Sequence, residues 1–235
     1  MSQAVELSVV ILCYRSGAAV VDFIKKAENL TKTLTDSYEL VLVANYIEGS
    51  DDRTRDYVLK IESENSRCKA LCKPKEGMMG WDMRSGMDAA SGNYICVIDG
   101  DGQFPIESIS ACFEQIRTGK YDLVKTYRTK RGDGIYRRFI SKVYNALFSM
   151  LFPGIGSNDA NSKPKILKKE AYQKMKLRSD DWFIDAEIML NIRDLGMSYH
   201  EIPIEFYELE GRSSFVKMPA ILEFIKNLFQ YRFGK

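Results

Sequence analysis

The chain has 235 residues, of which 45% are hydrophobic and 28% charged, and its formal net charge is +2. This composition is that of an ordinary globular protein, and the length suits one substantial core. A charge so close to zero excludes the strongly basic field of many nucleic-acid-binding proteins, so we expect no nucleic-acid partner.

The N-terminal stretch MSQAVELSVVILCY, residues 1–14, lacks the positively charged start of a secretory signal peptide. No window approaches the length of about 20 apolar residues that a membrane-spanning helix needs. The five cysteines show no paired metal-binding spacing, and their odd number is typical of a reducing compartment. We therefore expect a cytoplasmic protein.

Strand-like and helical patterns alternate through the first half of the chain. Continuous apolar runs predict buried strands, and apolar residues at helical spacing predict helices. The predicted elements are a strand over 7–14, a helix over 18–34, a strand over 38–45, a helix over 51–65, a strand over 68–73, a helix over 79–91 and a strand over 95–98. Such alternation favours an α/β fold with a mostly parallel central sheet flanked by helices.

The second half has a different pattern. A strand-like segment over 121–127 leads into a basic loop and an amphipathic helix over 139–152, which Pro153 and Gly154 end. A strand over 197–206 and a final helix over 219–233 follow. Because no linker or internal repeat interrupts the chain, we expect a single domain over 1–235.

Two aspartates, Asp99 and Asp101, end the strand over 95–98, and Gly100 and Gly102 alternate with them. Two carboxylates this close repel each other unless a cation or a proton neutralises them. Magnesium and manganese accept such oxygen ligands and leave positions open for a diphosphate. Ligands of α/β sheets bind beyond the carboxyl ends of the strands, which is where this pair is expected.

The same loop residues are compatible with other kinds of structure. An EF-hand needs Gly at position six and Glu at position twelve, where this chain has Phe104 and Ser110, so that interpretation fails. A simple turn stays open, because Asp-Gly is a common turn dipeptide.

The order of motifs along the chain resembles the inverting glycosyltransferase family 2. The segments LSVVILCYRSG (7–17), EGSDDRT (48–54) and GMMGWDMRSGMDAASGNYICVIDGDGQFP (77–105) are similar to its nucleotide-sugar half. The segments DANSKPKILKKEAY (159–172) and EIPIEFYELEGRSSF (201–215) resemble its dolichol-phosphate mannose synthase branch. The resemblance implies a GT-A, Rossmann-like fold, with a nucleotide-sugar-binding half over 1–127 and an acceptor-binding half over 128–235.

The resemblance also implies roles on the donor side. Asp101 and Gln103 would hold a divalent metal, magnesium or manganese, and Asp99 would lie near the ribose or the water shell of the metal. The other nucleotide-sugar-binding candidates are Cys13, Tyr14, Asn45, Glu48, Arg84 and Gly100. The chain departs from the family where Leu12, Arg15 and Ser16 replace Pro, Asn and Glu, and the turn bearing Asn45 and Glu48 carries extra residues. Arg84 stays open between a phosphate ligand and a surface arginine.

On the acceptor side, a dense group of cations precedes and enters the amphipathic segment over 139–152. It consists of Arg128, Lys130, Arg131, Arg137, Arg138 and Lys142. Such a helix either lies in a membrane interface or packs into the core, and the helix over 219–233 allows the same two interpretations. By resemblance, Arg128, Arg137 and Ser141 would bind a lipid phosphate, and Asp159 is a further acceptor-site candidate.

Two acids, Asp185 and Glu187, resemble the position of the family's catalytic base. A hydroxyl acceptor needs a base, whereas a phosphate acceptor is already anionic and needs none. The same acids can instead orient the acceptor or form a charge cluster at a helix N-terminus.

We expect an inverting, metal-dependent glycosyltransferase that moves a sugar from a nucleotide sugar to a polyprenyl phosphate. Its expected location is cytoplasmic and peripheral, on the cytosolic face of a membrane. The alternatives are transfer to a sugar hydroxyl of a cell-surface glycan and a catalytically silent nucleotide-sugar-binding protein. The sequence indicates no oligomeric state.

Overall fold

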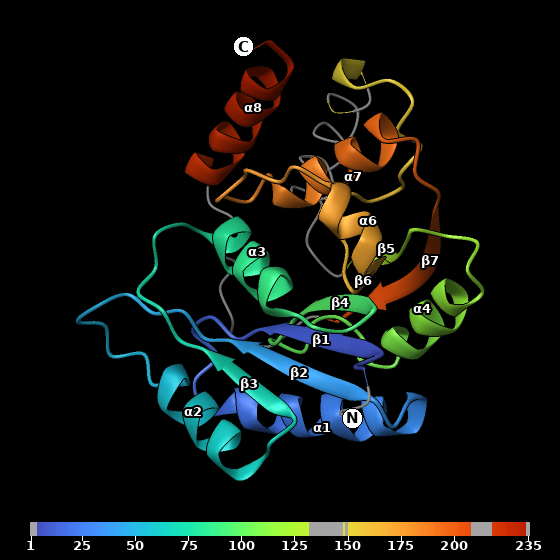
Figure 1. The fold of residues 1–235 in the computed structure, drawn as a ribbon. Helices are drawn as coiled ribbons and strands as arrows, with labels where there is room; N and C mark the ends of the chain where they lie inside the picture. The colour runs from blue at the N-terminus through green and yellow to red at the C-terminus, as the bar shows by residue number, and fades with distance from the viewer. Residues whose placement is uncertain (1–3, 132–147, 149, 208–217, 234–235) are drawn as a thin grey trace.

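The computed structural model describes residues 4–131, 148, 150–207 and 218–233. They form a central sheet with helices on both faces (Figure 1). The described elements are β1 (Leu7–Leu12), α1 (Ala19–Leu34), β2 (Tyr38–Val43), α2 (Thr54–Glu64), β3 (Cys68–Leu71), α3 (Met79–Ala89), β4 (Tyr94–Asp99), α4 (Ser108–Arg117), β5 (Leu123–Arg131), β6 (Lys165–Lys168), α6 (Lys169–Lys174), α7 (Ile184–Asp194), β7 (Tyr199–Phe206) and α8 (Met218–Phe233).

The sheet has seven strands in the order β3-β2-β1-β4-β6-β5-β7. The pairs β3–β2, β2–β1, β1–β4 and β5–β7 are parallel. Among the described strands, only β6 runs antiparallel to its neighbours, β4 and β5. The predicted α/β fold with a mostly parallel sheet is therefore confirmed.

Two apolar cores cover the two faces of the sheet. Side chains of α1, α2 and α4 pack on one face, and side chains of α3, α7 and α8 pack on the other. All six residues of β1 are buried, because helices cover the strand on both sides. This burial explains why the strand is a continuous apolar run rather than an alternating one.

Most predicted elements exist. The strands β1, β2 and β3 are shorter than predicted, whereas β4 extends one residue further at each end. The helices α4, α6 and α7 and the strand β6 were not among the predicted elements. Of the predicted amphipathic helix over 139–152, the structure describes only 148 and 150–152. Phe148 and Phe152 there are buried in the core, whereas Met150 is 72% exposed. At these positions the helix packs one face inward and exposes the other.

Candidate active site

The carboxyl ends of β1, β2 and β4 meet at one edge of the sheet, as neighbouring parallel strands require. The backbone pairing continues past the strands, since the amide of Cys13 donates to the carbonyl of Val43 at 2.8 Å. The amide of Gly100 donates to the carbonyl of Leu12 at 2.9 Å. Cys13 therefore lies beside the loop that begins at Asp99, as expected for a ligand site at this edge.

The 99–103 loop turns sharply at this edge. A side chain on Gly100 would put a Cβ 3.1 Å from the carbonyl oxygen of Leu12, so the loop packs tightly on β1. Gly102 has a φ of +77°, a conformation that favours glycine. The amide of Gln103 donates to the Asp101 carboxylate at 3.0 Å, which fixes that side chain near the turn.

The donor atoms of this loop fit a hard divalent cation. Magnesium and manganese prefer oxygen ligands. This loop offers the carboxylates of Asp99 and Asp101 and the side-chain amide oxygen of Gln103. Among the described residues, no three His, Cys, Asp or Glu side chains gather closely enough to hold a metal ion by themselves.

A buried lysine faces Asp99. The ammonium of Lys163 lies 3.4 Å from the Oδ2 atom of Asp99 and 3.3 Å from the Oδ2 atom of Asp185. Lys165, at the start of β6, reaches the other oxygen of Asp185 at 2.5 Å. The structure thus joins the predicted donor loop to the predicted acid on α7 through a lysine that sequence reasoning missed.

The charges in this group shift one another's proton affinities. Burial would raise the pKa of Asp185, but Lys163 and Lys165 outweigh it and hold that pKa below the ordinary value. Burial lowers the pKa of Lys165 to about 8, although Asp185 opposes the shift. For Lys163, the two carboxylates overcome burial and raise the pKa to about 12.

Glu187, the other predicted acid, lies in a different environment. Its carboxylate accepts backbone hydrogen bonds from Arg178 at 3.0 Å and from Ser179 at 2.9 Å. Burial raises its pKa, and these amide contacts oppose the rise. Glu187 therefore anchors the loop before α7, and no interaction described here connects it to Asp99.

Arg84 also binds the loop before α7 rather than an open cavity. Its guanidinium pairs with the carboxylate of Asp180 and donates from Nε to the carbonyl of Ser179 at 3.2 Å. The amide of Trp81 donates to the carbonyl of Asp180 at 3.2 Å. The N-terminal half of α3 and this loop are therefore fastened together.

Asn45, beyond the end of β2, belongs to a buried polar chain. Its amide donates to Asp82 on α3 at 2.9 Å, and its oxygen accepts from the amide of Lys73 at 2.9 Å. Lys75 pairs with Asp82 and lies 4.2 Å from the ring centre of Tyr14. Two nucleotide-side candidates, Tyr14 and Asn45, are thus linked through Lys75 and Asp82.

Asp82 and Lys75 were missed because their pairing depends on the tertiary fold. Burial raises the pKa of Asp82, whereas Lys75 and Asn45 stabilise its charge. A carboxylate on the apolar side of a helix, where Met83 and Met87 are also buried, was the available signal.

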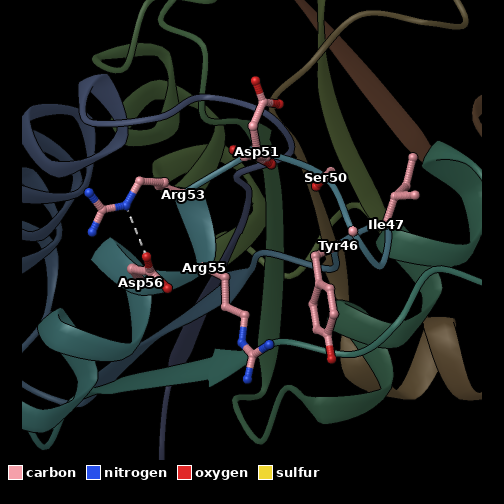
Figure 2. A pocket seen from close by; sticks show the side chains of 9 residues that line it. Tyr46, Ile47, Ser50, Asp51, Arg53, Arg55 and Asp56 are labelled. Carbon is pink, nitrogen blue, oxygen red and sulfur yellow. Dashed lines mark hydrogen bonds and ion pairs between the residues drawn. The ribbon is translucent and has the colours of Figure 1, made fainter.

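The connection from β2 to α2 forms a pocket of about 430 Å³ (Figure 2). Its lining residues are Tyr46, Ile47, Gly49, Ser50, Asp51, Asp52, Arg53, Arg55 and Asp56. The guanidinium of Arg55 lies 4.5 Å from the ring centre of Tyr46. Glu48 is exposed on this connection. The pocket overlaps the segment over 48–54, which resembles part of the family's nucleotide-sugar half.

On the acceptor side, Arg128 and Asp159 form a close pair. The guanidinium of Arg128 donates from Nε at 2.6 Å and from Nη2 at 3.0 Å to the two carboxylate oxygens. Its charged end also lies 5.2 Å from the ring centre of Phe206. Two predicted acceptor residues are therefore in contact, and the other two, Arg137 and Ser141, lie outside the described residues.

A family model described as glycosyl transferase family 2 matches residues 8–183 of this chain. An undecaprenyl-phosphate 4-deoxy-4-formamido-L-arabinose transferase of Klebsiella pneumoniae is 30% identical over 142 residues, covering 60% of this chain and 42% of the relative. A dolichyl-phosphate beta-glucosyltransferase of Trichomonas vaginalis is 25% identical over 219 residues, covering 86% of this chain and 64% of the relative. The chain thus spans less than two thirds of the length of these relatives.

A solved structure supports the fold. Glucosyl-3-phosphoglycerate synthase of Mycobacterium tuberculosis, solved with Mn2+, UDP and phosphoglyceric acid, superposes with a TM-score of 0.74. The identity is 17%, and the match covers 97% of this chain and 78% of that one. At this identity the likeness concerns the fold alone, and it agrees with the GT-A architecture.

Proposed function

We propose that this chain, which belongs to glycosyl transferase family 2, is an inverting, metal-dependent enzyme that moves a sugar from a nucleotide sugar to a polyprenyl phosphate. Relatives named as undecaprenyl-phosphate and dolichyl-phosphate transferases support this choice of acceptor. The donor site lies in the half over 1–127, and the acceptor site in the half over 128–235.

The main support for the proposal is that other protein groups already bind both acids of α7, Asp185 and Glu187. Asp185 is paired with two lysines, which stabilise its charged form and make it a weak base. The oxygens of Glu187 accept backbone amides. A phosphate acceptor is already a nucleophilic anion, so it needs no proton acceptor from this helix. A hydroxyl acceptor would need one.

On the donor side, Asp101 and Gln103 would hold magnesium or manganese, and Asp99 lies beside them. A divalent ion bound there supplies charge that neutralises the leaving nucleoside diphosphate. Cys13 and Gly100 border the diphosphate position at the strand ends. Tyr14 and Asn45 flank the nucleobase, next to the pocket over 46–56 and the exposed Glu48. Arg84 orients the loop before α7 on the same side of the donor site.

On the acceptor side, Arg128 binds the lipid phosphate, and Asp159 orients its guanidinium. A carboxylate that accepts from two N–H groups of a planar guanidinium fixes the plane and the direction of that group. Arg137 and Ser141, which the family resemblance nominates for the same phosphate, belong to the part of the chain that is not described.

The C-terminal helix α8 suits peripheral contact with the cytosolic face of a membrane. Phe229 and Phe233 are 44% and 67% exposed, and their rings stack with centres 6.1 Å apart. Arg232 lies between them in sequence, where it can meet anionic lipid. Within the described ranges, no helix combines the length and the apolar character needed to cross a bilayer.

The test is transfer of label from a panel of nucleotide sugars into polyprenyl phosphate, with manganese present and the organic phase counted. We expect one donor to deliver label with the natural chain and none with Asp101→Asn. Release of nucleoside diphosphate only when a glycan is added would replace the proposal with hydroxyl transfer. No transfer in either assay, with nucleotide sugar still bound, would replace it with a silent binding protein.

A further inference from the structure

Lys163 is a buried cation at the donor site that the proposed reaction does not yet use. Its side chain is 2% exposed, and its ammonium lies nearly equally far from Asp99 and Asp185, at 3.4 Å and 3.3 Å. The sulfur of Met79 is its third polar neighbour, at 3.6 Å. Both carboxylate distances exceed that of a strong charged hydrogen bond, so the ammonium bridges the two acids rather than belonging to one.

The surrounding charges balance. Asp99 and Asp185 carry two negative charges, and Lys163 and Lys165 carry two positive charges, with Lys165 bound to Asp185 at 2.5 Å. Taking ions out of water is costly unless opposite charges meet them, and this group satisfies that condition. The carboxylate of Asp99 is therefore already neutralised by the protein.

We propose that Lys163 is a built-in counter-cation that holds Asp99 back from the divalent ion. The ion then binds mainly through the Asp101 side of the 99–103 loop, and Lys163 stays as a second, fixed positive charge beside the leaving diphosphate. Lys163 is thus a positioning residue. This inference rests on the proposed function, because it assumes that the 99–103 loop is a metal site.

Loss of Lys163 should strengthen metal binding rather than weaken it. Lys163→Met removes the charge but keeps an unbranched side chain. Asp99 then becomes available as a second carboxylate ligand, and repulsion of the divalent ion disappears. Because charges a few ångströms apart interact strongly at partly buried sites, we expect manganese to bind about tenfold more tightly.

The experiment is titration with manganese alone, in which the free ion is followed by electron paramagnetic resonance. Lys163→Met should bind manganese more tightly than the natural chain. The matched control is Lys165→Met, which removes a lysine from the same Asp185 but none from Asp99, and its affinity should stay near that of the natural chain. In an Asp99→Asn background, Lys163→Met should give a clearly smaller gain in manganese affinity, because residue 99 then has no carboxylate that could become a ligand.

The proposal would be overturned if Lys163→Met did not bind manganese more tightly than the natural chain. It would also be overturned if Lys163→Met increased the manganese affinity equally in the natural and the Asp99→Asn backgrounds. If circular dichroism indicates that Lys163→Met does not fold, the pair Asp99→Asn and Asp101→Asn decides instead. Asp101→Asn should weaken manganese binding far more than Asp99→Asn, and equal losses would contradict the role of Lys163. Manganese binding needs no acceptor, so a chain that transfers no sugar to lipid phosphate can still pass this test.

Discussion

Arg128 on β5 and Asp159, in the segment before β6, form a two-pronged ion pair with N–O distances of 2.6 and 3.0 Å. The two side chains are only 14% and 5% exposed. The pair therefore ties the basic end of β5 to the chain segment that leads into β6. It also fixes the direction of Arg128, which among the described residues is the candidate ligand of the lipid phosphate.

Asp159→Asn should destabilise the protein, because it removes the carboxylate charge that pairs with a mostly buried guanidinium. We expect the free energy of unfolding to fall by about 3 kcal/mol, measured by urea denaturation. Arg128→Lys keeps the positive charge but loses the planar, two-pronged set of N–H donors. It should therefore raise the KM for polyprenyl phosphate and leave manganese binding unchanged. An unchanged unfolding free energy in Asp159→Asn would show that the pair does not fasten these segments.

The ion group around Asp185 predicts a pH dependence of stability. Its pKa is lowered in the folded protein, so its contribution is fully present above the unfolded value of about 3.9 and is lost as the pH falls below it. The unfolding free energy should therefore fall more steeply between about pH 4 and pH 2 in the natural chain than in Asp185→Asn. Parallel curves for the two proteins would contradict the lowered pKa.

The exposed rings of α8 predict binding to membranes. Replacing Phe229 and Phe233 together with serine should weaken sedimentation with anionic vesicles by about tenfold, because both rings lose their apolar contact with lipid. Gln230→Ser, an exposed polar change on the same helix, is the control. Equal binding of both variants and the natural chain would exclude α8 as the contact surface.

The sequence predicted the first half of the sheet well, because its strands are continuous apolar runs separated by helical patterns. It did not predict β6, which begins at Lys165 and lies between β4 and β5. Its segment is rich in lysines and contains Pro164, which are features of an exposed loop. Lys165 is nevertheless fully buried, because Asp185, twenty residues further along the chain, compensates its charge.

The candidate site, like the sheet, was predictable from the sequence only in part. The 99–103 loop was predictable, since its residues are contiguous and follow an apolar strand. The pairs Lys163–Asp99, Lys75–Asp82 and Arg128–Asp159 each join residues that are distant in sequence or that follow no periodic pattern. Ion pairs of this kind depend on the tertiary fold, so local patterns do not reveal which partner a charge will have.

The most direct test of the account compares two acceptors that differ in one group. The natural chain is given the same labelled nucleotide sugar with polyprenyl phosphate or with polyprenol, and label in the organic phase is counted. Because Asp185 and Glu187 are engaged by other groups, the account predicts transfer to the phosphate and none to the alcohol above the level of Asp101→Asn. Transfer to polyprenol at a rate comparable with polyprenyl phosphate would contradict it, since an alcohol needs the base that this site is proposed to lack.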